Sequence, residues 1–274
     1  ELQTADGRTR TYRLYRPTHR AADAPLLVAL HGGLGNGDQF AATSGYERLA
    51  EANGFVVVFP DGTPTAVGQR NLVWNGGGCC AAAVRNQVDD VGYLHALIAQ
   101  LGTSEGIDPT RVLVTGHSNG AIMAFRLACE DADQVVAVAG QAGTLFVDSC
   151  HPSRPVSALD LHGTADTNLP LAGGVGADSL VGADFPPVRD GLATLAKADG
   201  CTGPTPPTSR PTTQADVAAE DWGPCPGGVD VELVTVEGAT HSWMGHPAPS
   251  KNSATPYPDL DATLLAWSFL THHR

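Results

Sequence analysis

Positive charge and long apolar runs are scarce in this 274-residue sequence. Lysine and arginine number 16 against 29 aspartates and glutamates, and a net charge of -13 would repel a phosphate backbone or an anionic membrane surface. The longest apolar stretches, at 25–30 and 55–60, are far shorter than the ~20 residues that span a bilayer. We therefore expect no nucleic-acid partner and no membrane partner.

Metal-binding spacing is also absent from the six cysteines. They form no CxxC pair and no Cys/His grouping of the zinc-finger kind, so we expect no metal. An even number of cysteines without such spacing favours disulfides over free buried thiols, and with them an oxidising, extracellular compartment. Residue 1 is Glu rather than Met, which indicates a processed N-terminus.

Apolar, β-branched runs alternate with helical patterns along the chain. Apolar residues recur three or four positions apart around 91–101, 188–195 and 260–267, and each set predicts a helix with one buried stripe. The alternation predicts an α/β fold whose central sheet is mostly parallel, with helices on both faces and an antiparallel edge strand at 12–15. The runs expected to form strands buried on both faces are 26–30, 55–59, 112–115, 135–138, 156–161 and 231–236.

We interpret residues 1–274 as a single α/β domain. The Pro/Thr-rich stretch 202–224 could link two domains, but a strand and a final helix follow it, and Cys201 and Cys225 bracket it. We therefore expect a surface loop closed by a disulfide between those two cysteines. On the chain-entropy model, a disulfide closing a loop of this size stabilises by ~3–4 kcal/mol.

Two segments match the pattern GxSxG, which is typical of a serine nucleophile on a sharp turn. The segment 102–106 ends a helical stripe and leads into Ile107-Asp108-Pro109, so it indicates only the end of a helix. The segment 116–120 follows a strand and precedes a run of helix formers, and its serine is Ser118. This strand, turn and helix would lift the Ser118 hydroxyl above the sheet edge and aim helix N–H groups at the oxygen of its target.

A serine nucleophile requires a base and a carboxylate that orients the base. In one large class of hydrolases the acid and then the base follow the serine in the chain. Asp166 lies in the loop after the strand 156–161, whereas Asp160 lies within that strand, where a structural role is expected. His241 lies in the loop after the strand 231–236. We therefore expect Ser118, Asp166 and His241 to form a catalytic triad, while His162 has a packing or hydrogen-bonding role.

The glycine-rich segment 31–37 follows an early strand and lacks the GxGxxG spacing of a dinucleotide loop. In a hydrolase such a loop supplies one N–H of an oxyanion hole. We expect that donor to be Gly33, with Leu34 as the next choice, and the second donor to be Asn119.

Several motifs together resemble the polyhydroxybutyrate depolymerase-like esterases, a group related to feruloyl and acetylxylan esterases, and the resemblance covers nearly the whole chain. It implies the α/β-hydrolase fold, ester hydrolysis without metal or cofactor, and the triad Ser118, Asp166 and His241. Two departures stand out, because Met244 replaces the proline common after Trp243, and the loop 173–186 looks longer than usual. The motifs are His31-Gly32-Gly33, Trp74-Asn75 with Cys79-Cys80, Val88-Asp89-Asp90-Val91-Gly92, Gly116-His117-Ser118-Asn119-Gly120, His162-Gly163-Thr164-Ala165-Asp166 and His241-Ser242-Trp243.

The expected function is that of a secreted, monomeric serine esterase acting on a polymeric or small ester substrate. Polyhydroxyalkanoate or another polyester is the first substrate expected, and feruloylated or acetylated plant polysaccharide is the alternative. The three intact triad positions disfavour a catalytically silent binding module, which has no need of all three. A serine peptidase on the same fold is a third possibility, but such an enzyme usually carries a further binding domain, which we do not find in this sequence. Substrate contacts are expected from Trp74, Trp243, Leu34 and His117, with Trp222 as a further aromatic candidate.

Parallel-sheet geometry restricts the pairing of the cysteines. Cys129 and Cys150 should both lie at the edge of the sheet opposite the catalytic loops, whereas Cys79 and Cys80 should lie on the catalytic side. A disulfide needs Cα atoms within ~4.4–6.8 Å, so the two groups cannot pair with each other. We expect Cys129 to pair with Cys150 and Cys201 with Cys225, leaving Cys79 and Cys80 either free or joined to each other.

Overall fold

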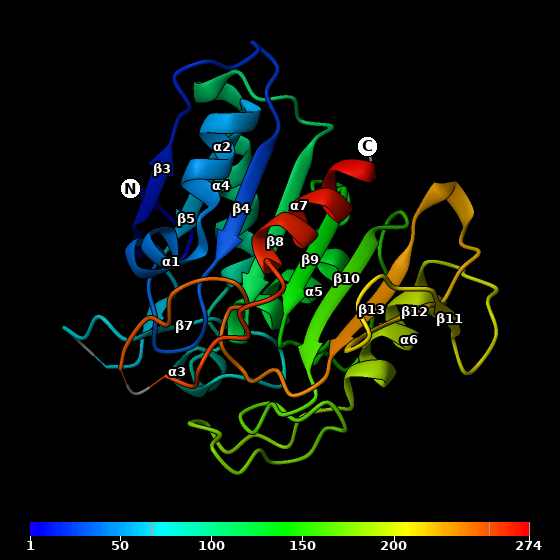
Figure 1. Ribbon diagram of the computed structural model, residues 1–274. Helices are drawn as coiled ribbons and strands as arrows, with labels where there is room; N and C mark the ends of the chain where they lie inside the picture. Colours follow the sequence, from blue (N-terminus) through cyan, green and yellow to red (C-terminus); the bar gives the residue numbers. More distant parts are fainter. Residues whose placement is uncertain (67, 252, 274) are drawn as a thin grey trace.

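A nine-stranded, mostly parallel sheet runs through the protein, which we describe from a computed structural model over residues 1–66, 68–251 and 253–273 (Figure 1). The strands from β13 to β5 are parallel, and β3 pairs antiparallel with β5 as the sequence predicted. In sheet order the strands are β11 (Thr208–Arg210), β12 (Val217–Asp221), β13 (Val231–Val236), β10 (Ser157–Gly163), β9 (Ala137–Gln141), β8 (Val112–His117), β4 (Leu26–Leu30), β5 (Val56–Pro60) and β3 (Tyr12–Tyr15).

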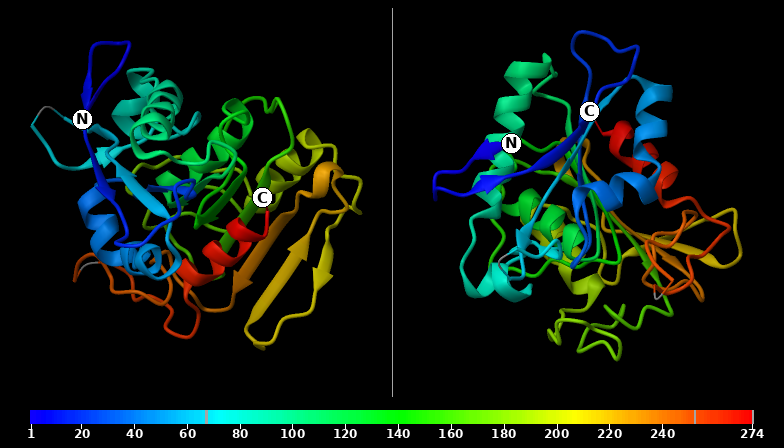
Figure 2. Two further views of the ribbon diagram at one scale, coloured as in Figure 1. Left: turned by 90° about the horizontal axis from the view of Figure 1, so that it is seen from above. Right: turned by 90° about the vertical axis from the view of Figure 1, so that its left-hand side faces the viewer.

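Helices cover both faces of this sheet, as the alternating pattern predicted (Figures 1 and 2). Helices α4, α5 and α6 pack on one face, and α1, α2 and α7 on the other. None of the helices in the described part of the chain is long and apolar enough to cross a lipid bilayer. The helices are α1 (Gly37–Ser44), α2 (Tyr46–Asn53), α3 (Ala81–Arg85), α4 (Asp90–Glu105), α5 (Asn119–Glu130), α6 (Val188–Ala198) and α7 (Ala262–His272), with a 3-10 turn at Pro226–Gly228.

Successive side chains of a strand point to opposite faces of the sheet, so one short apolar strand contributes to the cores on both faces. In β4, Leu26 and Val28 contribute to the core beneath α4, α5 and α6, whereas Leu27 contributes to the core beneath α1, α2 and α7. Every residue of β4 is buried, and the same is true of β5 and β9. Two small hairpins lie outside the main sheet, β1 (Leu2–Gln3) with β2 (Thr9–Arg10) and β6 (Thr63–Pro64) with β7 (Leu72–Val73).

The segment 202–224 is not the plain surface loop that its composition predicted. Its residues form β11 and β12, which extend the central sheet: β12 pairs antiparallel with β13, and β11 pairs antiparallel with β12. The disulfide between Cys201 and Cys225 closes the segment at its base, as expected. Trp222, which follows β12, is only 6% exposed and packs into the core, so the expectation that it lines a cleft is wrong.

The other cysteines pair within the alternatives that the sequence allowed. Cys129 at the end of α5 is joined to Cys150, with Cα atoms 4.9 Å apart. Cys79 is joined to its neighbour Cys80, one of the two arrangements left open for that pair. The first of these disulfides ties the helix that follows β8 to the segment that precedes β10.

One buried carboxyl lies at the end of the sheet away from the catalytic loops. Asp199 follows α6 and is 3% exposed, and one of its oxygens accepts a bond from the Val156 N–H at 3.3 Å just before β10. Its other oxygen has no hydrogen-bond partner among the described residues. Burial raises the pKa of Asp199 to about 7, against the opposing effect of the Val156 bond. Because the folded protein holds this proton more tightly than the unfolded chain, the free energy of unfolding falls as the pH rises from about 4 to about 7.

Replacing Asp199 by Asn should remove this fall in the free energy of unfolding with pH, since the amide cannot ionise. We expect Asp199→Asn to melt at a higher temperature than the parent protein at pH 8, and the difference to vanish near pH 4. Thermal unfolding followed by circular dichroism at both pH values checks this. Asp23→Asn, at an exposed carboxylate, is the control and should alter neither melting temperature. An equal stabilisation at both pH values would contradict the assignment.

Candidate active site

The second GxSxG segment forms a tight turn between β8 and α5. Strand β8 ends at His117 and α5 begins at Asn119, which leaves Ser118 between them with a φ of 54°, a left-handed value that is rare outside glycine. A Cβ on Gly116 would lie 2.3 Å from the Gly120 carbonyl oxygen, and a Cβ on Gly120 would lie 2.3 Å from the Leu30 carbonyl oxygen. Both flanking positions therefore require glycine.

The first GxSxG segment has no such turn. It forms the last turn of α4, and Gly106 ends that helix with a φ of 60°. Ser104 lies within the helix and is exposed. The sequence-based interpretation of this segment as a helix end is confirmed.

Ser118, His241 and Asp166 form one continuous chain of hydrogen bonds. The His241 Nε2 lies 2.8 Å from the Ser118 Oγ, and the His241 Nδ1 lies 2.7 Å from the Asp166 Oδ2. The three residues come from the C-terminal ends of β8, β13 and β10, where the loops of a parallel sheet gather. The structure thus brings together the three side chains that the chain order predicted.

Asp166 is held as a carboxylate by groups on both of its oxygens. Its Oδ1 accepts the N–H groups of Asn168 and Leu169, each at 2.9 Å, while Oδ2 faces His241. Burial by itself would raise the pKa of Asp166, but the hydrogen bond and charge of His241, the charge of His162 and the Leu169 N–H together lower it. The carboxylate is therefore kept ionised beside the imidazole.

Two side chains fix the loop that carries His241. The His117 Nε2 donates to the His241 carbonyl oxygen at 2.7 Å, and burial together with the charge of His241 lowers the pKa of His117 to about 4, so the ring is neutral. The Gln141 amide donates to the Ser242 carbonyl at 2.8 Å and accepts the Met244 N–H at 3.0 Å. Gln141 was not among the residues predicted from the sequence, although a polar residue that ends a buried strand at the catalytic edge was an available signal.

The glycine loop after β4 offers one free N–H toward the turn. The Leu34 N–H donates to the Leu72 carbonyl at 2.8 Å, so Leu34 has no N–H to offer an oxyanion. Within the described residues no partner is recorded for the Gly33 N–H, and a Cβ built on Gly33 would lie 3.5 Å from the Asn119 Cβ. The Asn119 N–H belongs to the first residue of α5 and has no partner inside the helix. Gly33 and Asn119 therefore lie close together beside Ser118, at the two positions where the sequence predicted the oxyanion donors.

His31 fixes the path of this loop. Its Nε2 accepts the Gly62 N–H at 3.0 Å, so the ring proton resides on Nδ1, which donates to the Gly32 carbonyl at 2.8 Å. Burial lowers the pKa of His31 to about 4, so the ring is neutral at neutral pH. His31 belongs to one of the motifs named above, but its role in holding the loop was not predicted from the sequence.

Trp74 does not line a cleft, contrary to the sequence-based expectation. It is 0% exposed, and its indole N–H donates to the His31 carbonyl at 3.0 Å. Its backbone N–H donates to the Asn119 Oδ1 at 2.7 Å, and its carbonyl accepts the Asn119 Nδ2 at 3.1 Å. Trp74 thus packs behind Asn119 and the loop after β4, where it is shielded from the solvent.

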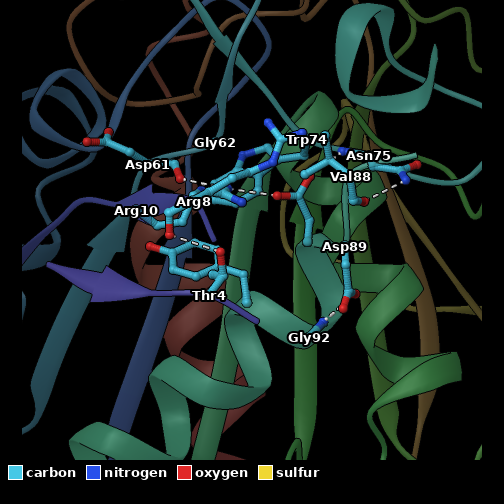
Figure 3. A network of polar contacts seen from close by, with 12 residues as sticks. Thr4, Arg8, Arg10, Asp61, Gly62, Trp74, Asn75, Val88, Asp89 and Gly92 are labelled. Atoms are coloured by element: carbon cyan, nitrogen blue, oxygen red, sulfur yellow. Dashed lines mark hydrogen bonds and ion pairs between the residues drawn. The ribbon is translucent and has the colours of Figure 1, made fainter. Parts of the chain in front are cut away.

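A buried ion pair anchors the segment that contains Trp74 (Figure 3). The Arg10 guanidinium donates to Asp90 at 2.7 Å and to the Asp61 carbonyl at 3.0 Å, and it lies 4.0 Å from the centre of the Tyr93 ring. The other Asp90 oxygen accepts the Asn75 N–H at 2.7 Å. Arg10 and Asp90 side chains are 5% and 0% exposed, so the pair is shielded from water.

An open cleft of about 970 Å³ leads down to Ser118 and His241. Leu34, His117 and Trp243 line it, as the sequence predicted, although Trp243 is only 4% exposed. The exposed side chains of Leu180 and Val181 lie at the same cleft. Among its described lining residues there is no lysine or arginine, and the one carboxylate is that of Asp178.

Comparison with known proteins identifies related sequences. A family model described as "Esterase PHB depolymerase" matches residues 10–180. Feruloyl esterase B of Piromyces equi is 31% identical over 226 residues, which are 80% of this chain and 40% of that protein. The bifunctional acetylxylan esterase/xylanase of Neocallimastix patriciarum is 27% identical over 88% of this chain and 32% of its own length. The chain therefore spans less than half the length of these two relatives.

Solved structures share the fold. The acetyl xylan esterase from Aspergillus awamori superimposes with a TM-score of 0.62 at 18% identity, over 84% of this chain and 88% of that one. Esterase PE8 gives a TM-score of 0.57 at 17% identity, over 96% of this chain and 100% of that one. Together with the strand order, these similarities confirm the predicted α/β-hydrolase fold.

The buried ion pair beneath Trp74 yields a stability prediction. Arg10→Met leaves the Asp90 carboxylate buried without its partner, and we expect a loss of about 3–5 kcal/mol in the free energy of unfolding. Arg10→Met combined with Asp90→Asn should recover much of the loss, because no unpaired charge then remains. Urea denaturation measures both effects.

Arg8→Met provides the matched control, because Arg8 pairs with Asp6 at the surface with side chains 42% and 38% exposed. Exposed pairs of this kind contribute at most ~1 kcal/mol. A loss for Arg10→Met no larger than that for Arg8→Met would show that the buried pair does not anchor the segment.

Proposed function

Since the chain belongs to the esterase PHB depolymerase family and is a carboxylic ester hydrolase, we propose that Ser118, His241 and Asp166 are its catalytic triad. The observation that carries this proposal is the unbroken chain of hydrogen bonds, 2.8 Å from Ser118 to His241 and 2.7 Å from His241 to Asp166, at the base of an open cleft. The proposal treats residues 1–274 as one catalytic domain, because a single sheet carries all three residues.

The geometry supplies each part of an acyl-transfer mechanism. Ser118 Oγ attacks the ester carbonyl carbon while His241 Nε2 takes the hydroxyl proton, and Asp166 stabilises the imidazolium that forms. The carbonyl oxygen becomes an oxyanion, which the N–H groups of Gly33 and Asn119 stabilise. His241 then gives its proton to the departing alkoxide, so the alcohol leaves and an acyl-serine remains.

Hydrolysis of the acyl-serine repeats these steps with water in place of the serine. His241 takes a proton from the water, the resulting hydroxide attacks the acyl carbon, and the proton returns to Ser118 as the acid product leaves. Only a neutral imidazole can act as the base, so activity falls at acid pH as His241 becomes protonated. The neutral ring of His117, beside His241, adds no competing positive charge.

Replacing Ser118 should test the nucleophile directly. We expect Ser118→Ala to lower kcat for p-nitrophenyl acetate by on the order of 10⁴- to 10⁶-fold without changing the melting temperature, because the side chain that forms the acyl intermediate is lost. Ser104→Ala, in the other GxSxG segment, is the control and should retain full activity. Loss of activity in Ser104→Ala with retention in Ser118→Ala would reverse the assignment.

For the substrate we propose a polyester with aliphatic acyl units, of the polyhydroxyalkanoate type. The aliphatic side chains of Leu34, Leu180 and Val181 are exposed beside the cleft, and the cleft holds no cationic side chain among its described lining residues. Trp243 is too deeply buried to offer its ring face to a sugar. An uncharged, apolar ester chain fits this lining best.

The alternative substrate is a feruloyl or acetyl ester on plant polysaccharide. The names of the Piromyces equi and Neocallimastix patriciarum relatives favour it. In that case the same triad would act on an ester attached to a carbohydrate, and the alcohol leaving group would be a sugar hydroxyl.

A panel of substrates separates the two proposals. One preparation is assayed on a polyhydroxybutyrate film, methyl ferulate and acetylated xylan, with Ser118→Ala as the blank. We expect soluble hydroxyacid from the film, and kcat/KM for methyl ferulate at least about 10-fold below that for p-nitrophenyl butyrate, since a poorly fitting acyl group loses transition-state contacts. Efficient release of ferulate or acetate with no attack on the film would favour the polysaccharide esterase.

We also propose that the protein works outside the cell as a monomer. Its three disulfides suit an oxidising compartment. Of the five large apolar side chains that are well exposed among the described residues, Leu34, Leu180 and Val181 lie at the cleft, which leaves little apolar surface for a stable subunit interface.

A further inference from the structure

A second pair of ionisable side chains lies buried directly behind Asp166. Asp160 and His162 are two residues apart on β10, so their side chains project from the same face of the strand, and both are 0% exposed. The Asp160 Oδ2 lies 2.8 Å from the His162 Nδ1. Buried groups of this kind are rare unless they are paired, and the triad itself requires neither of them.

The contacts of His162 determine its protonation. Its Nδ1 faces the Asp160 carboxylate, and its Nε2 faces the Leu169 carbonyl oxygen at 2.9 Å and the Asp166 Oδ2 at 3.6 Å. Every one of these neighbours is an acceptor, so the ring carries a hydrogen on both nitrogens and is an imidazolium. Burial by itself would lower the pKa of His162, but the bond and charge of Asp160 and the charge of Asp166 raise it above its ordinary value.

The same imidazolium closes the loop that carries Asp166. Leu169 is held twice, because its carbonyl accepts from His162 and its N–H donates to the Asp166 Oδ1 at 2.9 Å. Asp160 is held in turn by the Gly143 N–H at 3.3 Å, from the segment after β9. The loop from β10 to Leu169 is therefore tied back onto its own strand through one ring.

Carboxyl groups and imidazole rings alternate through this part of the protein. From β10 toward the cleft the order is Asp160, His162, Asp166 and His241, and His241 contacts Ser118. His117 approaches from β8 on the far side of His241 and is neutral. Asp166 thus lies between two imidazole rings, one of which faces the cleft and one of which is sealed from water.

We propose that His162, held by Asp160, is a positioning residue for the ester hydrolysis: it anchors the loop that presents Asp166 and directs positive charge at that carboxylate. The inference rests on the proposed function, because it requires Asp166 and His241 to act as the acid and base. His162 itself touches neither the cleft nor the reacting atoms, and it does not line the cleft.

Two consequences follow from the two roles. Because the charge on His162 opposes the gain of a further proton by Asp166 and His241, its removal should move the acid limb of the pH profile to higher pH. Because the anchor of Leu169 keeps Asp166 aligned with His241, its removal should lower kcat. KM should change little in either case, since substrate binding does not involve this ring.

Substitutions at one position separate charge from anchoring. His162→Gln keeps a donor that can reach the Leu169 carbonyl but has no charge, whereas His162→Leu lacks both. Asp160→Asn leaves the ring in place without the carboxylate that balances its charge, so the ring becomes neutral while its Nε2–H remains. Asp199→Asn makes the same chemical change at a buried carboxyl beside the opposite end of β10 and serves as the matched control.

The measurement is kcat and KM for p-nitrophenyl acetate against pH, on variants whose folding is checked by circular dichroism. For His162→Gln and Asp160→Asn we expect the acid limb to shift upward by roughly one pH unit, as removal of a nearby charge allows. For His162→Leu we expect kcat to fall on the order of 10²-fold, as expected when a catalytic group is misaligned. Asp199→Asn should leave both quantities unchanged.

The proposal is overturned if the acid limb stays at the parental pH in both folded His162→Gln and folded Asp160→Asn. It is also overturned if kcat of His162→Leu stays within about twofold of the parent. If one of these variants does not fold, the other two still give an answer. A failure of the proposed function looks different, because Ser118→Ala would then retain turnover whatever the His162 variants do.

Discussion

The close approach of α5 to the end of β4 is the constraint on which the rest of the site depends. Gly120 lies so near the Leu30 carbonyl that no side chain fits between them, and this contact forces the chain at Ser118 into its left-handed turn. At the same place Asn119, the first residue of α5, lies beside Gly33 in the loop after β4. The proposed nucleophile and oxyanion donors therefore share one backbone contact, which depends on glycine and on no particular side chain.

The loops that carry the acid and the base are held in a common way. His117, Gln141 and His162 lie at or near the C-terminal ends of three adjacent parallel strands, and each donates to a backbone carbonyl in a catalytic loop. Strand ends are among the best fixed positions in the fold, because their neighbours in the sheet hold them. A loop tied by its carbonyl groups can vary in its own side chains without moving His241 or Asp166.

The fold and the triad could be read from the sequence because their signals are local. Apolar runs predicted every central strand, and Asp166 and His241 follow strands in the expected order. The burial of Trp74 could not be read, since it depends on Asn119, which is 45 positions away in the chain. The strands within 202–224 were missed because a Pro/Thr-rich segment lacks the apolar alternation of a strand, and pairing with β13 stabilises them instead. The polar side chain at the end of a buried strand indicates that Gln141 has a partner, but the local sequence does not indicate that the partner is Ser242, 101 positions away.

The hairpin of β11 and β12 places β13, the strand that leads to His241, in the interior of the sheet. Without it β13 would be the edge of the sheet, whereas here β13 is paired along its length with β10 on one side and β12 on the other (Figure 1). Edge strands fray in local fluctuations, but an interior strand separates only when much of the sheet opens. The strand that leads to His241 is thus interior to the sheet, and its pairing with β12 must open before β13 can fray.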